Sequence, residues 1–437
     1  MRFGTDEIRG VANTKLTPSF ALDLGRAAAR VLGATCAVVG GDTRRSTPML
    51  EAALVAGLAS EGLEVHRLGV APTPAIAYHA ARLGGIGAVV SASHNPYADN
   101  GIKLFSPSGT KLPDEVEQLI EAELSVLGQP NGEPGVIVDS WAVHDRAAYV
   151  EHVLASLEGR SLAGMRIVVD AANGAAFEVA GEVFTRAGAE VLLINATPDG
   201  VNINRECGAT EPAGLARMVV ENGAYAGLAL DGDGDRLIAV DETGRVIDGD
   251  HVIAICAVDM RSRGLLRHDT VVVTVMTNLG FRLAMAEAGV EVVETAVGDR
   301  YVLEELQRGG YSLGGEQSGH VIFHDRASTG DGLATGLALL DVVARSGRRL
   351  GVLAAESMTQ LPQVLVNVRV SRQLPDIAEL LATEIDEAGR AFGGSGRILV
   401  RPSGTEPLVR VMVEAPSEEL ARSTADALAG LVESRYG

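Results

Sequence analysis

Three aspartates alternate with glycines in the segment Asp231-Gly232-Asp233-Gly234-Asp235. Glycine permits a tight backbone curve, and three carboxylates on one loop are hard oxygen ligands of the kind that Mg²⁺ binds. The remaining pattern of an EF-hand loop is absent. Without a cation these carboxylates would repel one another strongly. The segment therefore predicts a divalent metal site, and a polar turn is the alternative.

A serine-containing loop follows a short apolar run. Residues 86–90 (Ile-Gly-Ala-Val-Val) are typical of a buried strand. Residues 91–103 (Ser-Ala-Ser-His-Asn-Pro-Tyr-Ala-Asp-Asn-Gly-Ile-Lys) then bring the proline and Asn-Gly signals of a turn. A serine at the end of a rigid strand is well placed for covalent chemistry. The alternative is an ordinary strand-to-loop transition, and chemistry alone does not choose between Ser91 and Ser93.

The segment 401–407 (Arg-Pro-Ser-Gly-Thr-Glu-Pro) joins two expected strands and has the composition of a phosphate cradle. Two hydroxyls and a flexible glycine lie between arginines, and this combination suits an anion. The residues concerned are Arg401, Ser403, Gly404, Thr405 and Arg410. A plain hairpin turn is the alternative.

The segment 314–320 (Gly-Gly-Glu-Gln-Ser-Gly-His) also follows an expected strand. Glu316 and Ser318 suit sugar hydroxyls, and His320 suits a base or a phosphate contact because its pKa is close to neutral. We expect all three side chains to face one pocket, with a glycine-rich hairpin as the alternative. Arg300, just upstream, is expected to supply another cation. Arg9 lies in a segment that by itself resembles a frayed terminus.

Composition restricts the class of protein. The chain has 437 residues, which predicts three or four domains. Its net charge of −20 argues against a large nucleic-acid surface, and no apolar run is long enough to span a membrane. The three cysteines lack metal-ligand spacing, and no signal peptide is evident, so we expect a cytoplasmic protein. Lysine occurs only at positions 15, 103 and 111.

Alternating strands and helices are expected up to about residue 360. β-branched strands at 37–39, 168–169 and 272–275 each lead through small residues to a helix, which suggests three related α/β domains. From residue 361 the apolar pattern has period two, which indicates a small antiparallel α+β domain. The predicted domains are 1–155 with the serine loop, 156–250 with the aspartate loop, 251–360 with the Glu-Gln-Ser segment and 361–437 with the phosphate loop.

Taken together and in this order, the four motifs resemble the α-D-phosphohexomutase superfamily. The resemblance extends from Phe3 into the C-terminal domain. It implies three related α/β domains with mixed sheets and a smaller C-terminal α+β domain, arranged around a central cleft. It also implies that Ser93 carries a phosphoryl group, and that this phosphoserine and the three aspartates bind Mg²⁺.

Other roles follow from the same resemblance. Arg236 would help to hold the phosphoserine, and Glu316 and Ser318 would contact sugar hydroxyls. The non-transferred phosphate of the substrate would be held by the loop residues Arg401, Ser403, Gly404, Thr405 and Arg410. Three residues would line the catalytic cleft: Arg9, Lys103 and His320. Among them Lys103 is the first choice for proton transfer at the sugar oxygen, and His320 is the second.

Within the superfamily, segments 3–6, 91–96, 297–302 and 315–320 are most similar to the phosphoglucosamine mutase group. The implied reaction interconverts glucosamine 6-phosphate and glucosamine 1-phosphate, with a hexose 1,6-bisphosphate as intermediate and activator. One departure is Glu7, where that group usually has glycine. Glu7 adds a negative charge near Arg9, and it would be strained if the backbone there required a positive φ.

Two other functions remain open. Phosphomannomutase or phosphoglucomutase activity would use the same catalytic motifs. It differs from phosphoglucosamine mutase activity in the substituent at C2 of the sugar substrate. A non-catalytic phosphosugar-binding protein on the same fold belongs to another class. In each case we expect a small phosphosugar as partner, no nucleic acid, no membrane, and a monomer or homodimer.

Overall fold

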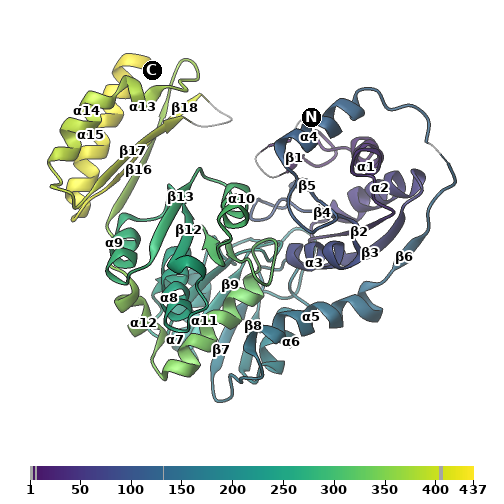
Figure 1. Cartoon of the computed structure of the whole chain (residues 1–437), viewed down its shortest axis with the longest axis horizontal. Coiled ribbons are helices and arrows are strands. Elements are labelled where there is room, and N and C mark those ends of the chain that lie inside the picture. Colours follow the sequence, from purple (N-terminus) through teal and green to yellow (C-terminus); the bar gives the residue numbers. More distant parts are fainter. Residues whose placement is uncertain (1–2, 5–6, 131, 403–406) are drawn as a thin grey trace. The chain divides into compact units, whose positions relative to one another are not determined.

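The computed structural model describes residues 3–4, 7–130, 132–402 and 407–437. Four sheets form in this part of the chain: mixed sheets of six, five and four strands, and an antiparallel sheet of three. Internal contacts divide the chain into two compact units. The first unit comprises Met1–Met276 and Val290–Ser357 and holds the three mixed sheets, whereas the second comprises Thr277–Gly289 and Met358–Gly437 (Figure 1).

The first sheet has the strand order β1-β5-β4-β2-β3-β6. Its strands are β1 (Ile8–Val11), β2 (Cys36–Gly41), β3 (Glu64–Val70), β4 (Ile86–Val90), β5 (Asp99–Phe105) and β6 (Ile137–Asp139). One face packs on α1 (Pro18–Leu32), α2 (Thr47–Ser60) and α4 (Asp114–Leu124), which share a core cluster with Ala37 and Val39. Gly87 faces Ala80 of α3 (Thr73–Leu83) on the other side. Because both faces are covered, the central strands are apolar throughout.

The second and third sheets follow along the chain. The second contains β7 (Arg166–Asp170), β8 (Glu190–Ile194), β9 (Ala226–Leu230), β10 (Leu237–Asp241) and β11 (Val246–Ile247). The third contains β12 (Thr270–Thr274), β13 (Glu291–Thr295), β14 (Leu313–Gly315) and β15 (Val321–Phe323). The helices of these regions are α5 (Arg146–Leu154), α6 (Ala180–Arg186), α7 (Ala213–Glu221), α8 (Gly249–Ser262), α10 (Asp299–Gly309), α11 (Gly332–Ser346) and α12 (Leu350–Ser357), with short turns η1 (Trp141–Asp145), η2 (Ala155–Leu157) and η3 (Arg267–Asp269).

The three mixed sheets repeat one topology. In each, a first strand pairs in parallel with the second and the third, and a fourth strand pairs antiparallel with the third. The third-to-fourth connections are β4–β5, β9–β10 and β14–β15. These connections are the serine loop, the aspartate loop and the segment containing Glu316. The expected fold class of three related α/β domains is therefore confirmed, and the three motifs occupy equivalent positions.

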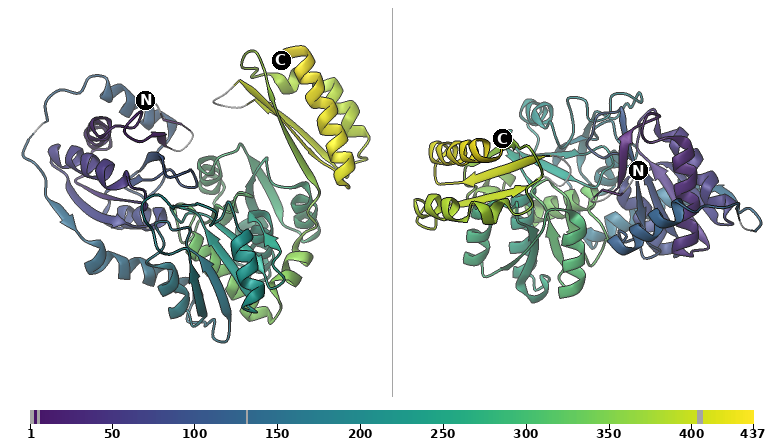
Figure 2. Two further views of the ribbon diagram at one scale, coloured as in Figure 1. Left: turned by 180° about the vertical axis from the view of Figure 1, so that it is seen from behind. Right: turned by 90° about the horizontal axis from the view of Figure 1, so that it is seen from above.

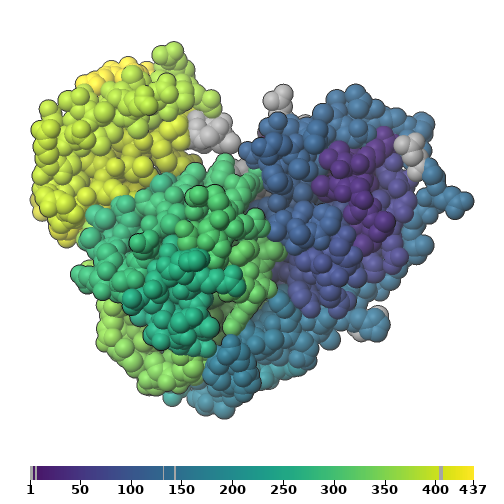
Figure 3. Space-filling view, viewed as in Figure 1, coloured from purple at the N-terminus to yellow at the C-terminus, as the bar shows by residue number. Residues whose placement is uncertain are grey.

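The first and third sheets are tied together within the first unit. In the space-filling view their surfaces, purple to blue and green, meet directly (Figure 3). Arg300 at the start of α10 donates to Glu117 of α4 at 2.5 Å and also pairs with Asp114. Lys111 donates to Asp299 at 2.5 Å. The expectation that Arg300 supplies a cation to the site is therefore wrong, because its guanidinium is bound to the carboxylates of α4.

The second unit is the expected small α+β domain. Its sheet, β16 (Gln363–Arg369), β17 (Arg397–Pro402) and β18 (Leu408–Glu414), is antiparallel throughout. Helices α14 (Ala382–Arg390) and α15 (Glu418–Tyr436) cover one face of this sheet (Figure 2). A short helix, α13 (Ile377–Leu380), precedes α14. Helix α9 (Leu279–Glu287) also belongs to this unit, and its Leu279 N–H donates to Glu414 at 2.9 Å.

The segment that contains Arg9 forms a strand, whereas its sequence alone resembled a frayed terminus. Residues Ile8–Val11 form β1, which pairs with β5 in the register Arg9↔Gly101. The pairing partner lies about ninety residues away in sequence, so no local pattern announces it. The boundaries predicted at residues 155/156 and 250/251 remain predictions, because the residues on both sides of each boundary belong to the same compact unit. Across the part of the chain that is described, none of the helices combines the length and apolarity of a membrane span.

Helices α1 and α2 cross at two glycines, which generates a prediction about packing. A Cβ at Gly57 would overlap the Leu22 carbonyl oxygen, and one at Gly25 would lie 2.5 Å from the Leu54 oxygen. We expect Gly57→Ala to lower the free energy of unfolding by about 1–3 kcal/mol through overpacking, although alanine favours helix. Urea unfolding followed by circular dichroism measures the change. Gly214→Ala in α7, where a Cβ meets nothing within 4 Å, is the matched control and should not destabilise the protein.

Candidate active site

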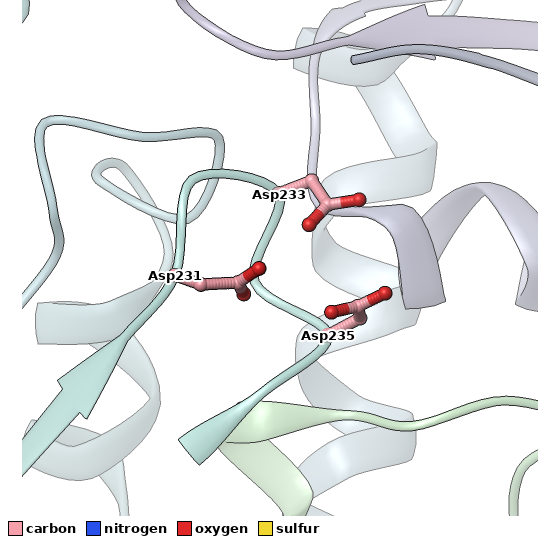
Figure 4. A group of neighbouring side chains, drawn as sticks. All are labelled: Asp231, Asp233 and Asp235. Carbon is pink, nitrogen blue, oxygen red and sulfur yellow. The ribbon is translucent and has the colours of Figure 1, made fainter. Parts of the chain in front are cut away.

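The aspartate loop connects β9 to β10 and brings three carboxylates together (Figure 4). Asp231, Asp233 and Asp235 are all buried, and one carboxylate oxygen from each lies within 4.8 Å of the others. Gly232 has no room for a side chain, because a Cβ there would lie 2.5 Å from the Ser93 carbonyl oxygen. Gly234 has a φ of +73°. Glycine therefore lets this loop curve against the serine loop.

Only some of the aspartate oxygens are paired within the protein. The Lys103 ammonium donates to Asp233 Oδ2 at 2.8 Å and to Asp235 Oδ2 at 3.4 Å. The Thr73 hydroxyl at the start of α3 donates to Asp233 Oδ2 at 2.7 Å. Asp233 Oδ1 and Asp235 Oδ1 are buried and have no hydrogen-bond partner among the described residues. Two buried carboxylate oxygens therefore accept no hydrogen bond from the described residues.

The buried charges shift one another's protonation. Burial, followed by repulsion from Asp235 and Asp233, raises the pKa of Asp231 well above its usual range. Burial also opposes ionisation of Asp235, but the charges of Lys103 and His320 hold the pKa of Asp235 well below its usual value. Among the three aspartates, Asp231 is therefore the one that takes up a proton most readily, whereas Asp235 stays ionised. The donor set of three carboxylates, with two unpartnered oxygens, fits a hard divalent cation.

Ser93 is placed directly on this acidic group. Its hydroxyl donates to Asp231 Oδ2 at 2.6 Å and lies 3.3 Å from His94 Nδ1. The Ser93 N–H donates to Ser91 Oγ at 2.9 Å. Burial, followed by the charges of Arg236 and Arg9, lowers the pKa of His94 to about 4, so this imidazole is neutral at physiological pH. The structure thus places Ser93 beside the aspartates and gives Ser91 a supporting contact.

Arg9 reaches the serine loop from β1, with Glu7 beside it. The Arg9 guanidinium donates to Asn95 Oδ1 at 2.8 Å and to Glu7 Oε1 at 2.5 Å. The Glu7 carboxylate lies over Gly101, where a Cβ would come within 2.7 Å of Glu7 Oε2. Burial raises the pKa of Glu7, although Lys103 and Arg9 oppose this shift.

The polar side chains of the loop between β14 and β15 lie in two groups. Glu316 accepts from the Gly298 N–H at 3.1 Å and from the Ser318 hydroxyl at 3.4 Å. His320 instead lies 3.6 Å from Asp235 and 3.0 Å from Asp299. Burial opposes protonation of His320, but Asp299 and Asp235 together raise its pKa. Glu316 and Ser318 thus form a pair, whereas His320 joins the aspartate loop.

Arg236 completes the positive charge of the first unit. It follows Asp235 directly, and its Nε lies 3.8 Å from Asp235 Oδ1. The Arg236 N–H donates to Asp231 Oδ1 at 3.2 Å. Burial opposes its charge, but Asp235 and Asp231 raise the pKa of Arg236 above its usual value. The predicted residues Ser93, Lys103, Arg236, His320 and the aspartates are therefore one charged cluster.

The second unit presents two arginines side by side. Arg401 on β17 is directly opposite Arg410 on β18. Burial, followed by the charge of Arg410, lowers the pKa of Arg401, and Arg410 Nε is buried with no partner among the described residues. Like charges opposite one another destabilise a sheet, so this pair suits an anion. The predicted contacts Ser403, Gly404 and Thr405 lie outside the described residues.

Sequence reasoning missed several contacts of the cluster. Thr73 binds Asp233, Asp299 binds His320, and Arg44 with Asp42 lies beneath the serine loop. A signal was present for Asp42 and Arg44, since they follow a buried strand as the serine loop does. Thr73 gave no such signal, whereas Asp299 lies in segment 297–302, which carried the resemblance without a role for this residue.

Family models match along nearly the whole chain. Domains I, II and III of the alpha/beta/alpha type in "Phosphoglucomutase/phosphomannomutase" match residues 1–129, 147–244 and 248–361, and the C-terminal domain of the same family matches residues 365–431. The chain belongs to the phosphoglucomutase/phosphomannomutase family. The four matched regions follow the order in which the four motifs occur.

Similar proteins cover the mutase chain from end to end. A protein of Streptomyces avermitilis named "Phosphoglucosamine mutase" is 53% identical over 450 residues, covering 100% of this chain and 99% of that protein. The crystal structure of a phosphoglucomutase/phosphomannomutase family protein from Burkholderia thailandensis superposes with a TM-score of 0.81 at 27% identity, covering 98% and 96% of the two chains.

A third relative shows the same fold at greater distance. The N-acetylphosphoglucosamine mutase of Aspergillus fumigatus, crystallised with GlcNAc-6P and magnesium, superposes with a TM-score of 0.65 at 21% identity. That match covers 83% of this chain and 92% of the fungal one.

The unpartnered oxygens of the aspartate loop predict stabilisation by a divalent cation. At a concentration of Mg²⁺ a hundred times its Kd, the folded protein should gain about 2.7 kcal/mol relative to the protein in EDTA. Asp231→Asn should abolish most of this gain, and it should stabilise the EDTA form because it removes one of three repelling charges. Differential scanning calorimetry measures both effects.

Asp170→Asn is the matched control for the metal experiment. Asp170 is also buried, but its carboxylate accepts from the Ala172 and Gly208 N–H groups. This variant should keep the full Mg²⁺ shift even if it is less stable. An unchanged Mg²⁺ shift in Asp231→Asn would show that the cation binds elsewhere.

Proposed function

We propose that this chain is a phosphoglucosamine mutase, which interconverts glucosamine 6-phosphate and glucosamine 1-phosphate through a phosphoserine at Ser93. The observation that carries the proposal is the 2.6 Å contact between the Ser93 hydroxyl and Asp231, inside a buried acidic cluster. The 53% identity to the Streptomyces avermitilis protein supports the substrate. The contact supports a nucleophile that receives and returns a phosphoryl group beside a metal.

The reaction consists of two transfers. In the first, the bond from phosphorus to Ser93 Oγ breaks while a bond to one hydroxyl of the sugar phosphate forms. The product is a hexose 1,6-bisphosphate, which then turns so that its other phosphate faces Ser93. In the second transfer, Ser93 Oγ takes that phosphoryl group and the isomeric monophosphate leaves. Free bisphosphate phosphorylates any chain that has lost its phosphoryl group, and it therefore acts as an activator.

Residues of the first unit would hold the transferring group. Asp231, Asp233 and Asp235, together with the phosphate on Ser93, are the proposed ligands of Mg²⁺. When bound, the metal would neutralise charge on the transferring phosphoryl group. Arg236 and Arg9 would hold the phosphoryl oxygens, and the proposal is supported by their contacts, since one flanks Asp235 and the other binds Asn95 of the serine loop.

One proton must also move in each transfer. It leaves the attacking sugar hydroxyl in the first transfer and ends on Ser93 Oγ. Lys103 is the proposed carrier, since its ammonium lies among the aspartates 2.8 Å from Asp233. His320 is the second candidate, 3.6 Å from Asp235 and also buried. Both groups would in addition offset the negative charge of the phosphoryl group.

Recognition of the rest of the substrate is assigned to two further sets of residues. Glu316 and Ser318, which already contact one another, would bind sugar hydroxyls. The opposed arginines Arg401 and Arg410 would hold the phosphate that is not being transferred, together with the loop residues Ser403, Gly404 and Thr405. A bound phosphate would offset the repulsion between these two arginines. Separate residues for the sugar hydroxyls and for the second phosphate suit a substrate that can carry a phosphate at either of two positions.

A second candidate function is phosphomannomutase or phosphoglucomutase activity. It is favoured by the similarity to the Burkholderia thailandensis family protein, which covers almost the whole chain. A non-catalytic phosphosugar-binding protein is disfavoured, because Ser93 and all three aspartates are present and in contact. We expect a cytoplasmic enzyme, since its three cysteines are unpaired, acting as a monomer or homodimer on a small phosphosugar.

Replacing the nucleophile tests the mechanism. Ser93→Ala should form no phosphoprotein when incubated with hexose 1,6-bisphosphate and Mg²⁺, and its mutase turnover should fall to background. Intact-mass spectrometry detects the phosphoryl group, and peptide mapping locates it. Ser91→Ala should still be phosphorylated at residue 93. Normal turnover of Ser93→Ala would exclude the proposed mechanism, and a wild-type chain that never gains a phosphoryl group would favour the binding protein.

A substrate panel tests the choice of sugar. The proposal expects kcat/KM to be highest for glucosamine 6-phosphate, compared with mannose 1-phosphate and glucose 1-phosphate under equal Mg²⁺ and bisphosphate. The reason is that a site complementary to one C2 substituent loses transition-state binding with the others. A higher kcat/KM for either neutral sugar would transfer the assignment to the second candidate function, while leaving the phosphoserine mechanism intact.

A further inference from the structure

A fully buried arginine lies beneath the serine loop. Arg44 follows β2, and its side chain has no exposed surface. The guanidinium donates to the carbonyl oxygens of Ser93 and Asn95, each at 2.8 Å, and to that of Asp99 at 3.1 Å. It also donates to the Pro96 carbonyl oxygen. One side chain therefore binds four carbonyl groups of the loop that carries the nucleophile.

Asp42 fixes the position of this arginine and also binds the start of the loop. Asp42 Oδ2 accepts from Arg44 Nε at 2.7 Å and from the Ser91 hydroxyl at 2.6 Å. Asp42 Oδ1 accepts from the Arg44 N–H and from the Thr47 hydroxyl at 3.0 and 2.9 Å. Ser91 Oγ in turn accepts from the Ser93 N–H at 2.9 Å. Through this pair, both the N–H and the C=O of Ser93 are held.

The backbone of Ser93 requires such support. Its φ is +47°, in the left-handed region that non-glycine residues seldom adopt. Conformations of this kind are unfavourable and persist only where the surroundings enforce them. With this backbone, the hydroxyl lies 2.6 Å from Asp231. The conformation that places the nucleophile on the aspartates is thus the one that Arg44 and Asp42 hold.

A guanidinium is the side chain that can perform this task. Its planar fork presents five N–H donors with fixed directions, and here they bind a carboxylate and four carbonyl groups. A lysine would keep the charge but offers three donors on one nitrogen. A buried guanidinium without hydrogen-bond partners would destabilise the protein strongly. The number and direction of its hydrogen bonds therefore indicate that Arg44 orients the loop.

The second sheet supplies an independent contact to the same carbonyl group. Asn204 Nδ2 donates to the Ser93 carbonyl oxygen at 2.9 Å and to that of Asn95 at 3.4 Å. No peptide bond of the described chain is cis, and in a trans peptide the C=O and the following N–H point in opposite directions. The His94 N–H therefore points away from Arg44, and no acceptor for it lies among the described residues.

We propose that Arg44 is a positioning residue for phosphoryl transfer, which holds Ser93 in its left-handed conformation so that Oγ faces Asp231. This inference rests on the proposed role of Ser93 as the nucleophile. Arg44 does not touch the reacting atoms, and it acts through the backbone of residues 93–99. Loss of its fork should misplace Oγ and slow both transfers, while substrate binding through Arg401 and Arg410 is unaffected.

The test compares Arg44→Lys and Arg44→Met with wild type. We measure kcat and KM with glucosamine 6-phosphate, and the single-turnover rate of Ser93 phosphorylation by hexose 1,6-bisphosphate. Arg44→Lys should lower kcat and the phosphorylation rate by about 10²-fold, as expected for a nucleophile displaced by about 1 Å. KM should stay unchanged. Arg44→Met should be slower still, because it donates no hydrogen bond.

Arg26→Met is the matched control. Arg26 is also a largely buried arginine of the first sheet region, where it donates to Glu61 at 2.9 Å and to the Gly128 carbonyl oxygen at 2.5 Å. It should lose thermal stability but keep the wild-type kcat. If Arg44→Met does not fold, Asn204→Gly provides the second variant, since glycine accepts the φ of +57° at that position. Its kcat should fall by about tenfold with unchanged KM.

The outcomes separate this inference from the function on which it rests. A wild-type chain that is not phosphorylated at Ser93 overturns the proposed function itself. Wild-type phosphorylation together with an unchanged rate in Arg44→Lys overturns only the role of Arg44. In a third outcome, only a fraction of the Arg44→Lys molecules can be phosphorylated, that fraction reacts at the wild-type rate, and kcat falls in the same proportion. This result also overturns the role of Arg44 in positioning, because it describes a residue that is needed only for folding.

Discussion

Three carboxylates buried within 4.8 Å of one another set the electrostatic conditions for the first unit. In a medium of low dielectric, such a group is tolerated only with cations close by. Lys103, Arg236 and His320 provide them, and each has a raised pKa because the aspartates outweigh the effect of burial. A further layer of acids, Glu7 and Asp299, then accompanies these cations. The arrangement alternates in sign outwards from the aspartate loop.

The repeated topology explains how chemistry from distant parts of the sequence meets there. In each mixed sheet, the reactive loop joins the third strand to an antiparallel fourth strand. Parallel strands end at one edge of their sheet, where loops commonly carry the functional groups. The three loops also contact one another: the Ser93 hydroxyl donates to Asp231, and the Leu237 N–H, just after the aspartate loop, donates to the Gly319 carbonyl oxygen. One structural position thus contributes the proposed nucleophile, the proposed metal ligands and the proposed sugar contacts.

The sequence predicted those features that depend on neighbouring residues, such as a buried strand or a loop of alternating aspartates and glycines. Strand Ile86–Val90 has the predicted bounds, and the Asp-Gly spacing alone predicted the carboxylate cluster. Long-range pairings could not be predicted in this way. The segment around Arg9 became a strand only because β5 pairs with it, and Arg300 binds carboxylates on α4 that no spacing indicates. The position of Arg44 after a buried strand could have drawn attention to it, but its four contacts with backbone carbonyl groups could not be predicted, because every residue has a carbonyl group.

The scarcity of lysine has a practical consequence for the chemistry of the protein surface. Of the three lysines, Lys103 and Lys111 have their ammonium groups bound to buried aspartates, and only Lys15 is exposed. Reagents that acylate amines therefore meet a single reactive side chain, at a turn after β1. A fluorophore or a surface tether attached through Lys15 would label every molecule in the same orientation and leave the charged interior untouched.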